Sequence, residues 1–468
     1  MNKFLSLLGF DPSKHSVKVE MMAGLTTFLT MSYILAVNPL ILGATGMDKG
    51  AIFSATIISA AIATLVMAFY AKLPYGLASG MGLNAFFAYT LVLALGYTYQ
   101  QALALVLFEG VCFILLTIFK IRESIFNAIP QSLRYAISVG IGLFIAYIGL
   151  TNGGVIVDSE STTTTLGPWT PTSVIAIAGV IVCCALMALK VRGALFITII
   201  GMTLIGIPFG VTKIPEDFSL VSMPQSMAPI AFKVDFSRFF TLDFNYYIVA
   251  FTLLFMDLFD TLGTLIGAST SASMVDEKTG EIPGMNRALM ADAVGTVAGA
   301  LCGTSTVTTY VESATGIAEG GRTGLTSLTI ALLFLVALFF SPFILIVPSA
   351  ATTSALVIVG TMMMMPIVKL NFSDLTESLP SFITIIAMPF TASISEGIVL
   401  GMLSYVAVKL LTGRFKDVSL AMYILSVLFI LKYILPVLQG LAAGAVRSRR
   451  RRHRRPPSAG RIRPAGDV

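Results

Sequence analysis

Long apolar segments separated by short polar loops run through most of the chain. A segment of about 20 apolar residues has the length that a helix needs to cross the hydrocarbon core of a bilayer. The pattern predicts about 14 such helices, some of them shorter, and therefore an all-α polytopic membrane protein. The expected spans cover residues 21–43, 51–71, 75–96, 100–119, 134–150, 173–189, 194–211, 245–268, 288–302, 304–318, 324–347, 350–367, 379–411 and 420–438. Residues 379–411 are too long for one span and include Pro389, so a helical hairpin with a fifteenth span stays open.

Two of these segments, the third and the tenth, have compositions that an undisturbed helix does not favour. The third contains Gly76, Gly80 and Gly82, and the tenth, at residues 303–312, is short and polar. The two segments occupy equivalent places when the first span is aligned with the eighth. Paired, glycine-broken segments indicate a transporter built from two inverted repeats of seven helices, here residues 21–211 and 245–440, joined by residues 212–244. The broken helices 3 and 10 are expected to meet inside the membrane, where freed backbone groups become ligands.

The charges of the loops indicate which side of the membrane each loop faces. With the N-terminus in the cytoplasm, the predicted inside loops contain basic residues such as Lys190, Arg192 and Arg322, and most predicted outside loops contain few. The predicted outside connection 212–244 is an exception because it contains basic residues, but the positive-inside rule gives less weight to long loops. The positive-inside rule therefore favours a cytoplasmic N-terminus. Residues 1–20 lack a cleavable signal pattern and are predicted to form an interfacial helix.

The composition supports a membrane location. Hydrophobic residues make up 56% of the chain and charged residues 12%, with a mean hydropathy of +0.89. Soluble domains carry about 25% charged residues, so a soluble enzyme, a disordered protein and a disulfide scaffold are excluded. The net charge of +6 depends on residues 441–468, which hold nine arginines and one aspartate. This Arg-rich tail is predicted to be a disordered extension or an appended segment that favours anionic lipid, and it lacks the interleaved aromatic residues typical of nucleic-acid binding.

The cysteines and histidines predict neither a metal site nor a disulfide. The four cysteines lie in apolar segments, and none has a zinc-like spacing with either histidine. We therefore expect the cysteines to be small packing residues, and no metal or other cofactor is expected. The cysteines are Cys112, Cys183, Cys184 and Cys302, and the histidines are His15 and His453.

Acidic residues inside the predicted spans are the candidates for chemistry, because a charge in the bilayer is costly and needs an explanation. Asp257 and Asp260 lie three positions apart near one face of a helix, so each discourages ionisation of the other and one could carry a proton. Alternatively, one of them caps or bridges a broken helix. Glu109 is expected to be a packing partner within the helix bundle rather than a functional residue. Glu319 and Glu396 are expected near water. The full set is Glu109, Asp257, Asp260, Asp292, Glu312, Glu319 and Glu396.

A cavity lined by acids and hydroxyls without a cation suits a neutral or cationic solute that is rich in N–H donors. A neutral purine has this chemistry, since one carboxylate can accept two parallel hydrogen bonds from its edge. Phe86, Phe87 and Phe255 could stack on such a ring, although ordinary packing explains apolar residues in these spans more often.

Two other functions remain as alternatives. An anion carrier of the sulfate or bicarbonate type could share the architecture, but the broken spans contain no Lys or Arg to hold an anion. An intramembrane aspartyl protease needs two aspartates on facing helices, whereas Asp257 and Asp260 lie on one helix.

Three motifs resemble those of the azaguanine-type purine permeases of the nucleobase–cation symporter-2 family, specifically bacterial guanine/hypoxanthine permeases. They are Gly-Met-Gly-Leu-Asn-Ala-Phe-Phe at 80–87, Phe-Met-Asp-Leu-Phe-Asp-Thr-Leu-Gly-Thr-Leu at 255–265 and Thr-Thr-Tyr-Val-Glu-Ser-Ala-Thr-Gly at 308–316. The resemblance extends over about residues 10–438. It implies a core domain of spans 1–4 and 8–11, a gate domain of spans 5–7 and 12–14, and proton-coupled purine uptake across the plasma (inner) membrane.

The same resemblance implies roles for individual residues. Asp260 is similar to the span-eight acid that holds the base in uracil permeases, and Glu312 to their span-ten glutamate. Asn84 and Asp292 also resemble functional positions of relatives. Thr264 stands where uracil permeases have a histidine, so proton coupling is expected to use carboxylates. The expected binding set is Asp260, Glu312, Asn84, Ser79, Gly80, Thr308 and Phe255, and the expected proton-coupling set is Asp260, Glu312, Asp257 and Asp292.

The expected substrate is guanine or hypoxanthine rather than adenine, although the sequence does not distinguish these purines. Expected partners are the base, a proton and membrane lipid, and a homodimer is among the assemblies left open. Proton and sodium coupling both remain open from the residues alone.

Overall fold

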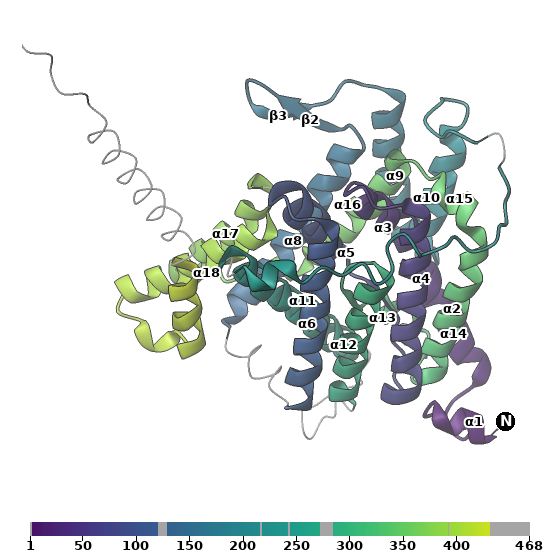
Figure 1. Cartoon of the computed structure of the whole chain (residues 1–468), viewed down its shortest axis with the longest axis horizontal. Helices are drawn as coiled ribbons and strands as arrows, with labels where there is room; N and C mark the ends of the chain where they lie inside the picture. The colour runs from purple at the N-terminus through teal and green to yellow at the C-terminus, as the bar shows by residue number, and fades with distance from the viewer. Residues whose placement is uncertain are drawn as a thin grey trace, which may run out of the picture.

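Apolar helices make up most of the computed structural model, which describes residues 2–119, 129–215, 218–241, 244–271, 284–391 and 393–430 (Figure 1). The first half contains α1 (Asn2–Leu7), α2 (Val17–Met31), α3 (Ile34–Gly43), α4 (Lys49–Val66), η1 (Met67–Ala71), β1 (Leu77–Ser79), α5 (Met81–Ala85), η2 (Phe86–Ala94), α6 (Tyr99–Ile118), α8 (Gln131–Asn152), β2 (Ile156–Ser159), β3 (Thr163–Leu166), α9 (Pro171–Ala188) and α10 (Ala194–Gly206). The second half contains η3 (Ser237–Phe240), α11 (Phe244–Ser271), α12 (Met285–Cys302), β4 (Val307–Thr309), α13 (Ser313–Ala318), α14 (Gly324–Ala337), η4 (Leu338–Phe340), α15 (Ser341–Leu345), α16 (Ser349–Met363), η5 (Met365–Lys369), α17 (Leu375–Phe390), α18 (Ile394–Leu411) and η6 (Phe415–Asp417).

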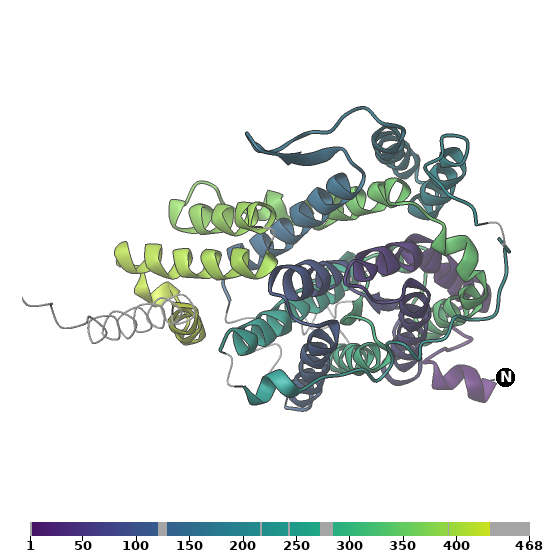
Figure 2. The same cartoon turned by 45° about the horizontal axis from the view of Figure 1, so that its top comes forward.

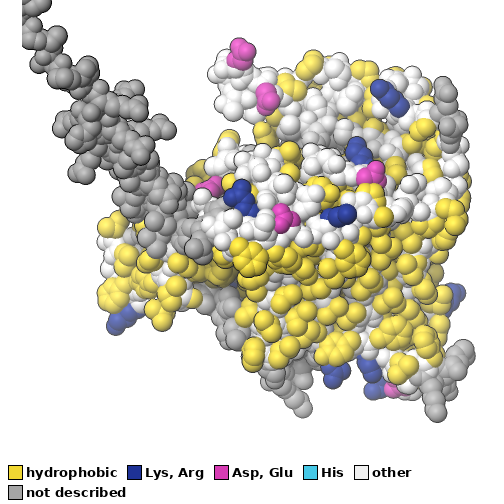
Figure 3. Space-filling model, in the orientation of Figure 1, with side chains coloured by type: hydrophobic (Ala, Val, Ile, Leu, Met, Phe, Trp, Pro, Cys, Tyr) yellow, Lys and Arg dark blue, Asp and Glu magenta, His cyan; other side chains and the backbone are white. Residues whose placement is uncertain are grey.

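The described helices form a multi-pass membrane protein. Seven are long and apolar enough to cross a bilayer, and four further apolar helices are shorter. Figure 3 shows a broad band of hydrophobic side chains on the surface, with charged groups gathered above and below it. Exposed residues such as Leu115, Ile181 and Leu332 give helices an apolar outer face that lipid can cover. The expected count of fourteen spans is not established by these helices, because several segments are short or interrupted.

The structure resolves the open question at residues 379–411. The segment forms two helices, α17 ending at Phe390 and α18 beginning at Ile394, which pack against each other. The Ser393 side chain accepts the N–H of Glu396 and so caps the start of α18. Gly401 leaves no room for a Cβ beside Thr384, so the two helices approach closely. The hairpin is therefore the correct alternative.

The packing divides the helices into two groups, which Figure 2 shows side by side. In the first helix group, α12 packs against α4 and α6, and α14 packs against α2 and α4. In the second helix group, α16 packs against α8 and α9, and α17 packs against α8 and α18. The groups contact each other more sparsely, as where α10 meets α2 and where α5 meets α8.

The two segments predicted to interrupt spans 3 and 10 are short strands that pair inside the first helix group. Strands β1 and β4 are antiparallel, with Leu77 opposite Thr309 and Ser79 opposite Val307. Both strands are buried, so their backbone groups satisfy one another away from lipid. Residues 76–80 and 304–310 are called the strand crossing below.

Two further expectations differ from the structure. The predicted interfacial helix at residues 1–20 is only the six-residue α1, and α2 already begins at Val17. The all-α expectation missed two small sheets, the strand crossing and the hairpin of β2 and β3. Residues 441–468, the predicted Arg-rich tail, lie outside the described residues.

Candidate binding site at the strand crossing

The two strands are joined by hydrogen bonds beyond their own pairing. The Gly80 N–H donates to the Thr306 carbonyl at 3.0 Å, and the Tyr310 N–H donates to the Gly76 carbonyl at 3.0 Å. The Tyr310 hydroxyl donates to the Ser79 carbonyl at 2.5 Å. Gly80 has to be glycine here, since a Cβ would lie 2.6 Å from a side-chain carbon of Thr308. The crossing is therefore a single close-packed unit made from both halves of the chain.

Glu312 lies directly after the crossing, at the N-cap of α13, and its side chain is 3% exposed. The Tyr33 hydroxyl donates to Glu312 Oε1 at 2.8 Å. Tyr33 belongs to the break between α2 and α3, so the first span also contributes to this site. The sequence analysis missed Tyr33, although a tyrosine within an apolar span is a signal for a buried hydroxyl that needs a partner.

Asp292 of α12 braces β4 from one side. It accepts the Thr309 N–H at 3.1 Å. The Thr261 hydroxyl lies 2.9 Å from Asp292 Oδ1, 3.1 Å from Asp257 Oδ1 and 2.8 Å from the Thr308 hydroxyl. Asp257, Asp292, Thr261 and Thr308 thus form one buried cluster. Thr261 was not among the predicted site residues.

Asp260 lies at the crossing but in a different environment from Asp257. Its side chain is half-buried, and its Oδ2 lies 3.5 Å from the place where a Cβ of Gly80 would be. Its charge interacts with those of Asp292 and Glu312. The three acids Asp260, Asp292 and Glu312 are therefore brought together by α11, α12 and the start of α13.

Asn84 connects the two broken segments from the first turn of α5. The Ser305 hydroxyl donates to Asn84 Oδ1, and the Ser79 hydroxyl is 2.9 Å from the Thr304 hydroxyl. Asn38 of α3, which the sequence analysis missed, donates to Thr304 at 3.0 Å. A row of hydroxyl and amide groups therefore runs along the crossing.

The aromatic candidates are mainly packing residues in this structure. Phe86 and Phe87 are fully buried in the core. Phe255 is buried and packs on Phe251, with 4.5 Å between ring centroids. The stacking of a base on Phe255 stays a prediction.

The two acids expected near water, Glu319 and Glu396, belong to other elements than the strand crossing. Glu319 is paired with Arg192 at 2.5 Å and accepts the Thr26 hydroxyl at 3.0 Å, so it joins the first helix group to the loop before α10. Glu396 lies in the first turn of α18. Within the described residues, no group of three or more His, Cys, Asp and Glu side chains could hold a metal ion, and the cysteines are unpaired.

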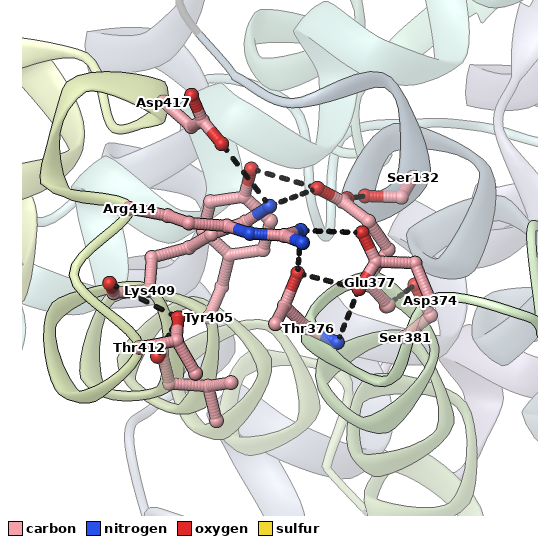
Figure 4. A network of polar contacts seen from close by, with 11 residues as sticks. Ser132, Asp374, Thr376, Glu377, Ser381, Tyr405, Lys409, Thr412, Arg414 and Asp417 are labelled. Carbon is pink, nitrogen blue, oxygen red and sulfur yellow. Dashed lines mark hydrogen bonds and ion pairs between the residues drawn. The ribbon is translucent and has the colours of Figure 1, made fainter.

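A second polar cluster lies in the second helix group, where α8 and α17 begin and α18 ends, near η6 (Figure 4). Lys409 is 2% exposed, and its Nζ is 2.6 Å from Glu377 Oε1 and 3.6 Å from Asp417 Oδ2. Arg414 pairs with Asp374 at 2.7 Å. Hydrogen bonds from Thr376, together with Arg414, lower the pKa of Asp374 to about 2. A cavity of about 470 Å³ adjoins this cluster, which the sequence analysis did not identify.

The chain matches the model described as Permease family, of xanthine/uracil type, over residues 18–400. A permease of Methanocaldococcus jannaschii is 47% identical over 91% of this chain and 97% of its own length. An adenine permease of Escherichia coli is 43% identical, covering 90% of this chain and 94% of the relative. A guanine/hypoxanthine permease of Bacillus subtilis is 40% identical, covering 89% of this chain and 97% of the relative.

Two solved structures of transporters for anions have a fold similar to that of this chain. The transmembrane domain of a cyanobacterial bicarbonate transporter superposes with a TM-score of 0.60 at 16% identity, covering 82% of this chain and 96% of that chain. The murine solute carrier 26 family member A9 in its inward-facing state gives a TM-score of 0.60 at 14% identity, covering 89% and 72%. At such identities the likeness concerns the fold alone.

Proposed function

The chain belongs to the Permease family of xanthine/uracil type, and we propose that it carries a purine nucleobase across the plasma membrane together with a proton. The observation that carries this proposal is the convergence of Asp260 and Glu312 on the strand crossing, beside a row of hydroxyl groups. An adenine permease that is 43% identical and a guanine/hypoxanthine permease that is 40% identical to this chain support a purine as the substrate.

A purine edge complements these acceptors. Guanine presents its N1–H and its 2-amino group side by side, so one carboxylate can accept both. Hypoxanthine keeps the N1–H donor, whereas on the same edge adenine has an acceptor at N1 and donates only from its amino group. Carboxylates at Asp260 and Glu312 therefore favour guanine and hypoxanthine over adenine. Ser79, Asn84, Gly80 and Thr308 would then contact the rest of the base.

The cluster around Thr261 supports proton coupling through carboxyl groups. Thr261 has one hydroxyl hydrogen, yet its oxygen lies within hydrogen-bond distance of Asp257, Asp292 and Thr308. A hydroxyl can donate to only one of these acceptors, so a proton on one carboxyl group would satisfy a second contact. We propose that Asp257 and Asp292 store the coupled proton next to Asp260 and Glu312.

The two helix groups suit transport by alternating access. The first helix group, which holds the strand crossing, corresponds to the core domain, and the second corresponds to the gate domain. The antiparallel pairing of β1 with β4 supports two inverted repeats that place one broken segment each at the site. Movement of one group against the other would expose the base first to one side and then to the other. The N-terminus would lie in the cytoplasm.

An anion carrier is not favoured by the site. Within the described residues, Glu312, Asn84 and Ser79 make hydrogen bonds with hydroxyl and backbone groups, and none of these bonds comes from a lysine or arginine. An anion site would need such a positive group close to the substrate. The aspartyl protease is also not proposed, because the relatives are transporters.

The test is uptake of labelled guanine, hypoxanthine, adenine and uracil by cells that lack their own nucleobase carriers, with and without a protonophore. We expect guanine and hypoxanthine uptake above that of cells with the empty vector, and its loss when the protonophore is added. Absence of uptake for every purine, with the protein present in the membrane, would overturn purine transport. Uptake that ignores the protonophore would overturn proton coupling.

A further inference from the structure

A buried carboxylate on α6 lies behind the strand crossing and has no part in the binding set described above. The Glu109 side chain is 0% exposed, inside a helix of the apolar type that crosses membranes. Its Oε2 accepts a hydrogen bond from the Thr306 hydroxyl at 2.7 Å. Because an acid in the middle of such a helix is costly, this contact calls for a function.

Thr306 occupies a central place in the crossing. Its carbonyl oxygen accepts the Gly80 N–H at 3.0 Å, which ties it to the start of α5. The two residues before it contact the first broken segment, Ser305 through Asn84 and Thr304 through Ser79. A shift of Thr306 would therefore move the hydroxyl row that is proposed to meet the base.

Helix α6 packs closely against α12, so it can support the strand crossing. Gly110 faces α12 so closely that a Cβ would lie 2.8 Å from a side-chain carbon of Val297 and 3.1 Å from one of Thr296. Thr296 in turn donates to the Val307 carbonyl of β4 at 3.0 Å. Glu109 is thus attached to a rigid pair of helices on one side and to the crossing on the other.

We propose that Glu109 is a positioning residue that holds segment 304–306 in place for the base by accepting the Thr306 hydroxyl. Glu109 acts through its acceptor oxygen, not through its charge, and it does not contact the base. This inference rests on the proposed function, since it assigns a support to the same site.

The experiment measures guanine affinity by calorimetry in nanodiscs and KM and Vmax of guanine uptake. Glu109→Gln keeps an acceptor oxygen, and Thr306→Ser keeps the hydroxyl, so both are expected within about threefold of the wild type. Glu109→Leu and Thr306→Val remove the contact, and each is expected to raise Kd and KM by about tenfold with little change in Vmax. The double variant is expected to be no weaker than either single variant, because both remove the same bond.

The controls separate this inference from the proposed function. If the wild type binds no purine, the proposed function fails first. If the wild type binds guanine and Thr306→Val binds it equally well, only the positioning role is overturned. Additive losses in the double variant, or a Glu109→Gln variant as weak as Glu109→Leu, would also overturn it. Thr306→Val is nearly isosteric, so the test stands even where Glu109→Leu fails to fold.

Discussion

Replacement of Glu312 by glutamine tests whether this carboxylate holds the base. A hydrogen bond to a charged group is worth about 1.5–3 kcal/mol. Glutamine keeps one acceptor oxygen but puts an NH₂ group in place of the other, so one of the two bonds to the purine edge is lost. The lost bond corresponds to a weakening of about 10- to 150-fold in Kd, at 1.4 kcal/mol for each factor of ten. The Tyr33 hydroxyl still finds an acceptor, so the fold should persist.

The assay is calorimetric titration of guanine into purified protein, with size-exclusion chromatography to verify the fold. Glu160→Gln is the matched control, because Glu160 is exposed in the loop between β2 and β3, outside the crossing. The control removes the same charge and is expected to bind like the wild type. A Glu312→Gln variant whose Kd lies within about threefold of the wild type would refute the reasoning.

Three further predictions concern other parts of the structure. Gly80→Ala places a Cβ 2.6 Å from a carbon of β4 and is expected to abolish guanine uptake. Gly201→Ala is the control, because its Cβ meets open space and uptake should be unchanged. Equal uptake by the two variants would contradict a function for the strand crossing in transport. Arg192→Glu and Glu319→Arg should each change the initial uptake rate by about two- to fivefold, and the variant with both substitutions should regain the wild-type rate. A double variant no better than either single variant would show that the ion pair between the helix groups has no effect on transport. The pKa of Asp374 is lowered to about 2 from 3.8, so the stabilising effect of its carboxylate is present above pH about 4 and is lost as the pH falls towards 2. Asp374→Asn should therefore reduce the change in melting temperature between about pH 4 and about pH 2. A variant with the same pH profile as the wild type would count against the contacts of Asp374 with Thr376 and Arg414.

The sequence predicted the broken segments but not their form. Glycines in segment 76–82 and polar residues in segment 303–312 showed that no regular helix could run through either place. A strand of three residues, such as β1 or β4, is too short to show the alternation by which strands are recognised. Their pairing depends on the packing of distant helices, and no local pattern reports it.

The two aspartates of α11 show why spacing alone was insufficient. Residues three apart on a helix differ by about 60° around its axis, so they share a general face but not the same surroundings. Asp257 joins Thr261 and Asp292, whereas Asp260 lies beside Gly80. The sequence predicted one pair of interacting aspartates, whereas the structure places Asp257 and Asp260 in two different environments of one site.

Contacts between residues far apart in the chain were not predictable from one sequence. Tyr33 meets Glu312 across 279 positions, and the partner of a buried hydroxyl is chosen by the fold. Lys409 likewise gave no signal, since a lysine near the end of an apolar segment usually reaches solvent. In the structure it is buried against Glu377 because α17 and α18 fold back on each other.

The most direct measurement is an experimental structure with 8-bromoguanine bound, in which the bromine locates the base. The account predicts that the base lies at the strand crossing, with its edge within hydrogen-bond distance of Asp260 or Glu312. A base located elsewhere, such as in the cavity beside Lys369 and Asp417, with no base in contact with the strand crossing, would contradict the account.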